Sequence, residues 1–284
     1  MERLSTHRRL LVGSSVPKVD YAGRGGRRHR FVGEKKLANV SCSRLLLLAL
    51  LILVQVSWSS PSSVWTLEGH RLIALDALSV LPPQMREALT SHISPLLAGV
   101  EEPDFFRATS HKIPIISLRG TPPPPRSGAP DALKQFATNA QEMLRLGRDL
   151  WDVLFVVGQA THFVQDLNQP LHAGWGETRA EHNEIEARML YRSWQKEHTH
   201  RGVILVRDHS CFAHEIAQNS AQHTRALFFD RDIKLVTELA WDQAVNDTAN
   251  LWQSILWNTF GPVRAAQMYG IPAPVTNVAR GSLC

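Results

Sequence analysis

The sequence predicts an all-α protein, and three observations carry this prediction. Between residues 65 and 284, apolar residues recur at the spacing of helix faces over several long segments. Glycine and proline residues stand where these segments end, as expected of helix termini. Alternation typical of strands is scarce, and residues 202–206 form the only tempting run. We therefore expect a single multi-helix bundle over residues 65–284.

Seven segments are expected to form the helices of this bundle. In chain order they are residues 70–81, 84–97, 131–146, 149–167, 179–197, 210–228 and 233–260. Pro82-Pro83 ends the first helix, and Gly261-Pro262 ends the last. Asp131 is the expected N-cap of the third helix and Gly147 its C-cap.

One of these helices and one loop indicate where a functional site lies. The helix over 149–167 is apolar on nearly all sides, so we expect it to be the central, buried helix. Residues 112–130 are rich in proline and are expected to form a loop. This loop follows His111 directly, which places it at the border of the expected site.

The charge of the chain is concentrated in its first residues. Residues 1–44 carry eleven Lys or Arg against three acids, and residues 45–64 carry no charge. The remaining residues hold twenty bases and twenty-three acids, so the net charge of +5 belongs to the leader. The expected domain is mildly acidic, which removes most support for a basic groove that binds nucleic acid.

The leader over residues 1–64 is typical of an exported protein. An apolar run of twelve residues, 45–56, follows Arg44 as the hydrophobic core of a signal peptide does. This run is short for a membrane span, which needs about 20 apolar residues. We expect export, either secreted or periplasmic, with membrane tethering if residues 45–56 are not cleaved. Cys211 and Cys284 could form one disulfide in such a compartment.

Five metal-binding residue types lie between positions 162 and 186. They are His162, Asp166, His172, His182 and Glu186. The first two and the last two are i,i+4 pairs, so each pair shares a helix face with Cβ atoms about 5–6 Å apart. One such pair could be a buried histidine that donates to a carboxylate. Two pairs joined by Pro170 and His172 favour a site with several zinc ions, because imidazole and carboxylate both bind zinc.

The string HFVQDLNQPLH, residues 162–172, resembles the signature of the zinc-dependent phospholipase C family. That signature is a His, an aromatic residue, an Asp, then Pro and His, and here a second His-x3-Glu pair follows it. The family shares a trinuclear zinc fold with single-strand nucleases of fungi and plants. The resemblance covers residues 65–186 by motif, and it implies an all-α bundle around three zinc ions.

The resemblance also implies which residues bind each ion. His162 and Asp166 would bind the first zinc ion, with Asp166 bridging to another. The second ion would be held by His172, His182 and Glu186.

For the third ion, the resemblance implies an amino-terminal tryptophan and a nearby histidine, which Trp65 and His70 match. Cleavage after Val64 would free the Trp65 amine, and an amine with a pKa near 8 is neutral enough to bind a metal. Two further ligands are expected upstream of the signature. Asp104 and His111 match them, with Glu102 as the alternative to Asp104.

These residues predict hydrolysis of phosphodiesters by metal-activated water, with Asp104 as a ligand and possible general base. The nuclease branch carries Trp-Ala-Asp, His-aromatic-Ile-Asn and a longer insert between its later histidines. Here the chain has PDFF, SHKI and only nine residues over 173–181, which resembles the phospholipase branch. We therefore expect a phospholipid substrate and transient contact with a membrane surface.

Two alternatives stay open. The Trp-x4-His start, residues 65–70, resembles the nucleases, so a single-strand nuclease or 3'-nucleotidase that binds nucleic acid is the first. The second is a helical binding protein with structural zinc and no turnover, because closed structural sites keep no open position for a substrate.

Overall fold

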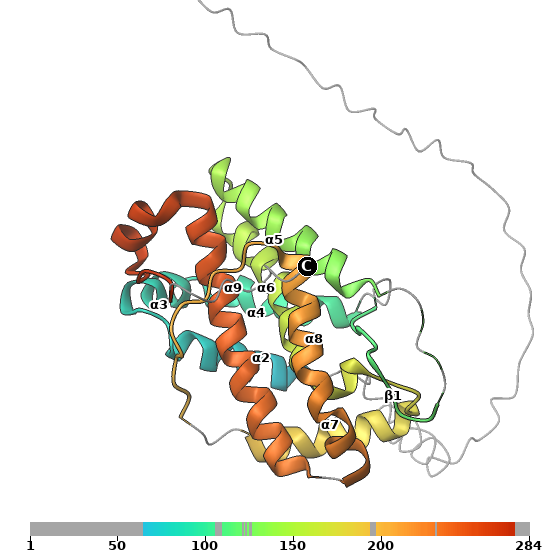
Figure 1. Ribbon diagram of the computed structural model, residues 1–284. Helices are drawn as coiled ribbons and strands as arrows, with labels where there is room; N and C mark the ends of the chain where they lie inside the picture. Colours follow the sequence, from blue (N-terminus) through green and yellow to red (C-terminus); the bar gives the residue numbers. More distant parts are fainter. Residues whose placement is uncertain are drawn as a thin grey trace, which may run out of the picture. The chain divides into compact units, whose positions relative to one another are not determined.

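The central element of the fold is helix α6, Leu150–Asn168. The computed structural model describes residues 65–105, 110–120, 122, 124, 127–193, 197–230 and 232–275. In it α6 packs against α4 (Ile93–Glu101), α5 (Ala129–Arg145), α8 (His209–Arg225) and α9 (Ile233–Tyr269) (Figure 1). Asp149 is its N-cap and accepts a hydrogen bond from the Trp151 amide at 2.8 Å. The predicted central helix is therefore confirmed.

Two glycines allow α4 and α6 to cross with their backbones in contact. A Cβ atom on Gly158 would lie 2.2 Å from the carbonyl oxygen of Leu96. A Cβ atom on Gly99 would lie 1.9 Å from the carbonyl oxygen of Phe155. Both distances are far below van der Waals contact, so no side chain fits at either position while the helices keep this spacing.

The helices before α5 differ in part from the prediction. Helix α2, Leu67–Ser79, begins three residues earlier than expected, behind the N-cap Thr66. The single helix predicted over 84–97 is wrong. Two helices occupy this region, α3 (Pro83–Thr90) and α4, and His92 between them has a non-helical φ of −129°. Pro95 in the first turn of α4 marks this break, because its ring would clash with the Ser91 carbonyl in a continuous helix.

The N-cap predicted for the third helix is also wrong. Helix α5 starts at Ala129, with Gly128 as N-cap and Pro130 in its first turn, so Asp131 lies inside the first turn. A proline in the first helical turn is favourable because its missing N–H would have no helical partner there.

The C-terminal helices extend beyond their predicted ends. Helix α8 passes into a π-helical turn, η3, over Ala226–Asp230. Helix α9 breaks at Gly261, whose φ is 78° and ψ 167°, with Pro262 next. The break is where the sequence predicted it, but the helix resumes and continues to Tyr269, where Gly270 in the left-handed conformation ends it.

A short parallel ladder ties the proline-rich segment to the end of α6. Strand β1 (Ile116–Ser117) pairs with β2 (Gly174–Trp175), which follows the 3₁₀ turn η2 (Pro170–Ala173). The Ile113 amide also donates to the His172 carbonyl at 3.0 Å. Neither strand was predicted, because two residues carry no alternation to detect.

Residues 202–206 do not form the strand that their pattern suggested. Their backbone amides donate to side chains of α9 instead, Ile204 to Asn250 at 3.0 Å and Val206 to Ser254 at 2.8 Å. Helix α9 therefore takes the place of a partner strand for this segment.

The protein is all-α, as predicted, apart from the two-residue strands. The predicted leader over 1–64, including residues 45–56, lies outside the described residues, as do Cys42 and Cys284. Cys211 is disulfide-bonded. Within the part of the chain that the structure describes, every helix is too short or too polar to cross a membrane.

Candidate metal centre

Asp166 lies at the centre of the cluster that the sequence predicted. Its Oδ1 is 3.2 Å from His70 Nε2, and its Oδ2 is 2.8 Å from His111 Nδ1 and 3.0 Å from His162 Nε2. His172 Nδ1 is 3.9 Å from the same Oδ2. The side chain of Asp166 is fully buried, yet neither oxygen has hydrogen-bonding geometry with any of these groups. The nitrogens of His70, His111 and His162 converge on this carboxylate as ligands around a common ion do.

The fold brings these residues together from five elements. His70 comes from α2, Asp104 from the 3₁₀ turn η1 (Glu102–Phe105), and His111 from the segment before β1. His162 and Asp166 lie one turn apart on α6, and His172 lies in η2. Asp166 is therefore reached by His70, ninety-six positions earlier in the chain, and by His111, fifty-five positions earlier.

Three histidines are oriented by the same kind of bond, in which Nδ1 faces an oxygen that accepts hydrogen bonds. The pairs are His70 with Gln165 Oε1 at 2.7 Å, His162 with the Val100 carbonyl at 2.8 Å, and His172 with the His111 carbonyl at 3.1 Å. Each Nδ1 must carry the proton, because an amide or carbonyl oxygen only accepts. In the neutral ring Nε2 then keeps its lone pair for a metal, as is typical of metal-binding histidines.

In the described part of the chain, three groups of residues have ligand atoms within 4.8 Å of one another. The first group is His70, His162 and Asp166, and the second is His172, His182 and Glu186. His182 and Glu186 are one turn apart on α7 (Arg179–Ser193), and His182 Nε2 is 2.8 Å from Glu186 Oε1. Gln169 donates to the same Glu186 oxygen at 2.9 Å. The predicted i,i+4 pair therefore faces His172 across the end of α6.

Asp104 and His111 complete a third group with His162, again with ligand atoms within 4.8 Å of one another. Asp104 Oδ1 is 3.9 Å from His162 Nε2. Glu102, the alternative to Asp104, instead accepts a hydrogen bond from Gln159 at 2.7 Å. The structure thus places Asp104, and not Glu102, in the cluster.

Trp65 lies beside the cluster. Its indole is buried, packs edge-on against Trp241 at 5.3 Å, and donates to the carbonyl oxygen of Gln165 at 3.0 Å. Gln165 is also the residue that orients His70. The prediction that the Trp65 amine binds a metal stays a prediction, because residues 1–64 lie outside the described part of the chain.

The residues present fit zinc. Buried polar side-chain atoms are almost always hydrogen-bonded, so several without partners in one place indicate a missing ion. The atoms without partners are His70 Nε2, both Asp166 oxygens, Asp104 Oδ2, His172 Nε2, His182 Nε2 and Glu186 Oε2. Imidazole nitrogens and carboxylate oxygens are the donors that zinc accepts where thiolates are absent.

Burial disfavours the charged forms of the carboxylates in the cluster, and a bound cation would stabilise these charged forms. Burial alone lowers the pKa of His70, but the adjacent Asp166 outweighs it and raises that pKa to about 9. Burial alone raises the pKa of Asp166, but the surrounding histidines hold it well below its ordinary value. Burial raises the pKa of Asp104 and of Glu186. Positive charge in the cluster stabilises all three carboxylates.

Two residues that the sequence did not predict, Glu177 and Lys112, support the second group. Glu177 accepts hydrogen bonds from His182 Nδ1 at 3.2 Å and from Lys112 Nζ. Burial alone raises the pKa of Glu177, but His182 and Lys112 lower it to about 2. Glu177 is five residues before His182 and outside any helix, so no periodic signal could have connected them.

Comparisons with known proteins support the fold. Neither models of protein families nor curated protein sequences give a match. Among solved structures, the chain is similar to alpha-toxin of Clostridium perfringens from an avian strain, with a TM-score of 0.50 and 13% identity, over 69% of this chain and 65% of that one. It is also similar to alpha-toxin of Clostridium absonum, with a TM-score of 0.51 and 13% identity, over 70% and 66%.

At this sequence identity the likeness shows a shared fold. The matched region spans about two thirds of each alpha-toxin chain.

Proposed function

We propose that this protein is an exported, zinc-dependent phosphodiester hydrolase that cleaves phospholipids in the manner of a phospholipase C. The observation that carries the proposal is that each of the three candidate groups offers three ligand residues. A structural zinc ion is closed by four protein ligands, whereas three protein ligands leave a position for water or substrate. Asp166 is fully buried, whereas the side chains of His111, His182 and Asp104 are 15%, 10% and 9% exposed.

The three ligand groups would hold three zinc ions. His162 belongs to two of the groups, and Asp166, in the first, also lies 2.8 Å from His111 and 3.9 Å from His172. When bound, zinc makes water nucleophilic at neutral pH and neutralises the negative charge of a phosphodiester. No arginine or lysine is then required to bind the phosphate, which suits the mildly acidic domain.

Asp104 is proposed as both ligand and general base. Its Oδ2 is buried without a hydrogen-bond partner, and burial raises its pKa. As a member of the third ligand group, this carboxylate would take the proton from a water molecule that the zinc ions activate. Asp104 and its neighbour in this group, His111, keep some exposure, 9% and 15% of their side chains.

A phospholipid substrate is supported by the likeness to alpha-toxins and by the short segment between His172 and His182. Transient contact with a membrane surface follows from that substrate. Export is supported by the basic leader and the apolar run over 45–56. The start Trp65-x4-His70 favours the nuclease as second candidate, so both substrates belong in the test.

The test compares hydrolysis of phosphatidylcholine and of single-stranded DNA by the chain beginning at Trp65, after zinc removal and after zinc is restored. We expect phosphatidylcholine cleavage that depends on zinc. Asp104→Asn should lower the rate by at least about 100-fold, the usual contribution of a general base together with its ligand role. Glu102→Gln is the matched control, since Glu102 bonds to Gln159 outside the cluster.

Cleavage of DNA alone would replace the phospholipase with the nuclease. Absence of turnover on both substrates, with zinc bound, would favour the non-catalytic binding protein. Full activity of Asp104→Asn with full zinc content would remove the proposed role of Asp104. Adding one residue before Trp65 should lower the affinity for one of the zinc ions if the amine is a ligand.

A further inference from the structure

The side chain of Trp65 is fixed from two sides. It is buried, and its indole nitrogen donates to the Gln165 carbonyl of α6 at 3.0 Å. Its ring meets the ring of Trp241 on α9 edge to face, with the centroids 5.3 Å apart and the planes at 85°. Aromatic pairs favour this arrangement, and a donated hydrogen bond also fixes the direction of an indole. Trp65 therefore has one orientation relative to α6 and α9.

The main chain of Trp65 is tied to the helix that carries His70. Thr66 follows Trp65 directly and is the N-cap of α2. Its carbonyl oxygen accepts hydrogen bonds from the amides of Gly69 at 2.6 Å and His70 at 3.3 Å. His70 in turn lies 3.2 Å from Asp166 in the metal cluster. A single residue thus connects Trp65 to a helix that is anchored in the cluster.

The backbone conformation of Trp65 suits the first residue of a chain. Its φ is 30°, and in the described part of the chain it is the only residue other than glycine with a positive φ. A residue with a side chain disfavours this region, because the side chain crowds the neighbouring peptide units. The angle φ exists only where a peptide bond precedes the residue. A chain that begins at Trp65 is therefore free of this strain, which a longer chain bears because the contacts of the indole hold the residue in place.

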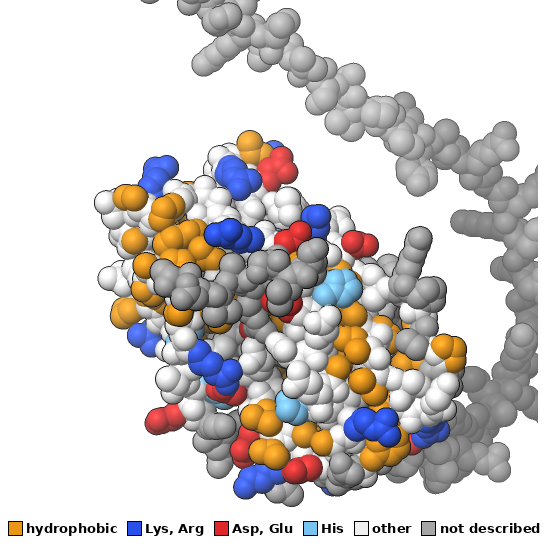
Figure 2. Space-filling view, in the orientation of Figure 1, with side chains coloured by type: hydrophobic (Ala, Val, Ile, Leu, Met, Phe, Trp, Pro, Cys, Tyr) orange, Lys and Arg blue, Asp and Glu red, His pale blue; other side chains and the backbone are white. Residues whose placement is uncertain are grey.

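Trp241 is itself oriented by a polar network. Its indole nitrogen donates to Asp76 Oδ2 on α2 at 2.8 Å. The same oxygen lies 3.3 Å from Nε2 of the buried His198, whose Nδ1 lies 3.3 Å from Asp242 Oδ1. Arg201 pairs with Asp242, and Figure 2 shows basic and acidic side chains next to each other over α9. The ring of Trp241 is thus fixed by partners on α2, on α9 and in the segment before α8.

We propose that Trp241 is a positioning residue, which holds Trp65 so that the main-chain amine of Trp65 lies at the metal centre. Asp76 serves the same purpose by orienting Trp241. This role rests on the proposed binding of zinc by that amine. Neither Trp241 nor Asp76 belongs to the three candidate ligand groups, so their effect on zinc passes through Trp65. Residues that orient a ligand without binding the metal typically change metal affinity by about 10–100-fold.

The test measures the affinity for each zinc ion by chelator competition in the chain that begins at Trp65. Residues 60–284 form one compact unit, so this chain retains the fold. Trp241→Leu and the addition of one glycine before Trp65 are measured singly and together. We expect each single change to weaken the binding of one zinc ion at least about tenfold. The double change should bind as the chain with the added glycine does, because a blocked amine has no position to lose.

Asp76 allows a conservative rescue. Asp76→Ala should weaken the binding of the same zinc ion, because the indole of Trp241 loses its acceptor. Asp76→Asn keeps an oxygen that can accept this hydrogen bond, so it should bind zinc as the wild type does. An equal loss of affinity in the two variants would remove the role of Asp76.

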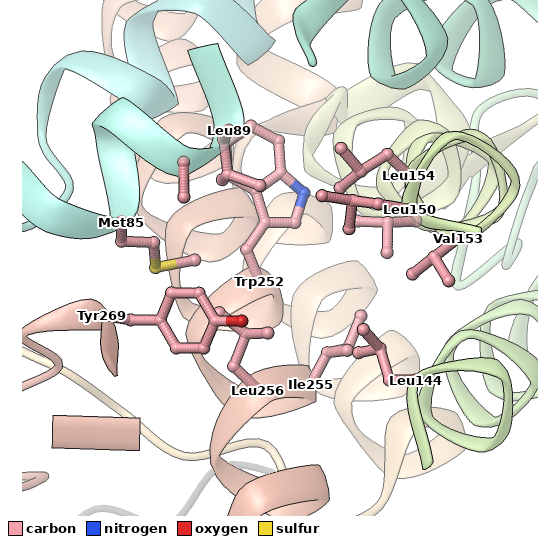
Figure 3. A pocket seen from close by; sticks show the side chains of 12 residues that line it. Met85, Leu89, Leu144, Leu150, Val153, Leu154, Trp252, Ile255, Leu256 and Tyr269 are labelled. Atoms are coloured by element: carbon pink, nitrogen blue, oxygen red, sulfur yellow. The ribbon is translucent and has the colours of Figure 1, made fainter. Parts of the chain in front are cut away.

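Ile255→Ala is the matched control for a general loss of stability. Ile255 is buried on the same helix as Trp241, and Figure 3 shows it beside an apolar cavity. At about 1.5 Å per residue, it lies roughly 21 Å along α9 from Trp241. This variant should unfold at a lower urea concentration, yet it should bind every zinc ion as the wild type does.

Additive effects of Trp241→Leu and the added glycine would overturn the proposal, because Trp241 would then act independently of the amine. Unchanged zinc affinity after either single change would also overturn it, as would an equal loss of affinity in Ile255→Ala. If circular dichroism shows that Trp241→Leu is unfolded, Trp241→Phe decides by the same criteria, because it removes the indole nitrogen and keeps a ring. No substrate is present, so these results are independent of the hydrolysis test.

Discussion

Replacing Gly158 by alanine should destabilise the protein, although alanine is the better helix former. The added Cβ would lie 2.2 Å from the Leu96 carbonyl oxygen and 2.7 Å from the Val100 amide nitrogen. Both atoms belong to the backbone of α4, so no side chain can rotate away. Helix α4 would have to move by about 1 Å to reach ordinary contact.

The magnitude follows from three contributions. Alanine gains about 1 kcal/mol over glycine in a helix interior. Overpacking of a core costs about 1–3 kcal/mol, and contact with rigid backbone belongs at the upper end. Moving α4 also weakens the buried bond between His162 and the Val100 carbonyl, now 2.8 Å long, at a cost of about 1–3 kcal/mol. We expect the free energy of unfolding to fall by about 3–5 kcal/mol in total.

Urea unfolding of the zinc-loaded protein, followed by circular dichroism, measures this change. Asn139→Ala, at an exposed position of α5, is the control that reports helix propensity alone and should be neutral or slightly stabilising. Stability of Gly158→Ala equal to the wild type would show that the two helices do not cross in backbone contact. Weaker zinc binding in the same variant would trace the effect to the orientation of His162.

Three further predictions concern the metal centre and a histidine remote from it. Glu177→Gln should weaken zinc binding about 10–100-fold in a chelator competition, because Glu177 orients His182. Glu184→Gln, on the exposed face of α7, should change it little. Removing zinc should lower the melting temperature, and restoring zinc should recover it, because ligands that bind only the folded state stabilise it. The buried side chain of His198 lies 3.3 Å from each of two aspartates, which raise its pKa above the ordinary 6.5. Its stabilisation is therefore present below pH 6.5 and lost as the pH rises through the folded pKa. His198→Asn should cost about 1 kcal/mol at pH 6 and less at pH 9 in urea unfolding.

The parts of the site that the sequence predicted are those with a local signal. His162 with Asp166, and His182 with Glu186, are one helical turn apart, so spacing alone indicates that each pair shares a face. The apolar surroundings of His162 likewise predicted that α6 is central. The structure confirms the helix of each pair and brings both pairs to the same cluster.

The parts that the sequence did not predict depend on tertiary contacts. Glu177 and Lys112 meet across sixty-five positions, and Gln165 orients His70 across ninety-five. The break between α3 and α4 at His92 is different, because it has a local signal: Pro95 lies inside the helix predicted over 84–97, where a proline is disfavoured. Whether a side chain such as Glu177 or Gln165 orients a metal-binding histidine is decided by tertiary packing, and a pattern along the sequence does not contain this information.

The parallel ladder of β1 and β2 fixes the chain on either side of the metal ligands, so the proline-rich loop can vary in length and sequence. The proline-rich loop is closed at its base on both sides, by the Leu118 amide on the Trp175 carbonyl at 2.8 Å and by the Ser127 hydroxyl on the Lys112 carbonyl. The residues between these anchors bear no ligand of the cluster. Because doubling the length of a loop costs only about 0.6 kcal/mol, this segment could be lengthened or exchanged without displacing His111 or His172. We expect loop grafts here to change which substrates are accepted while zinc content stays constant.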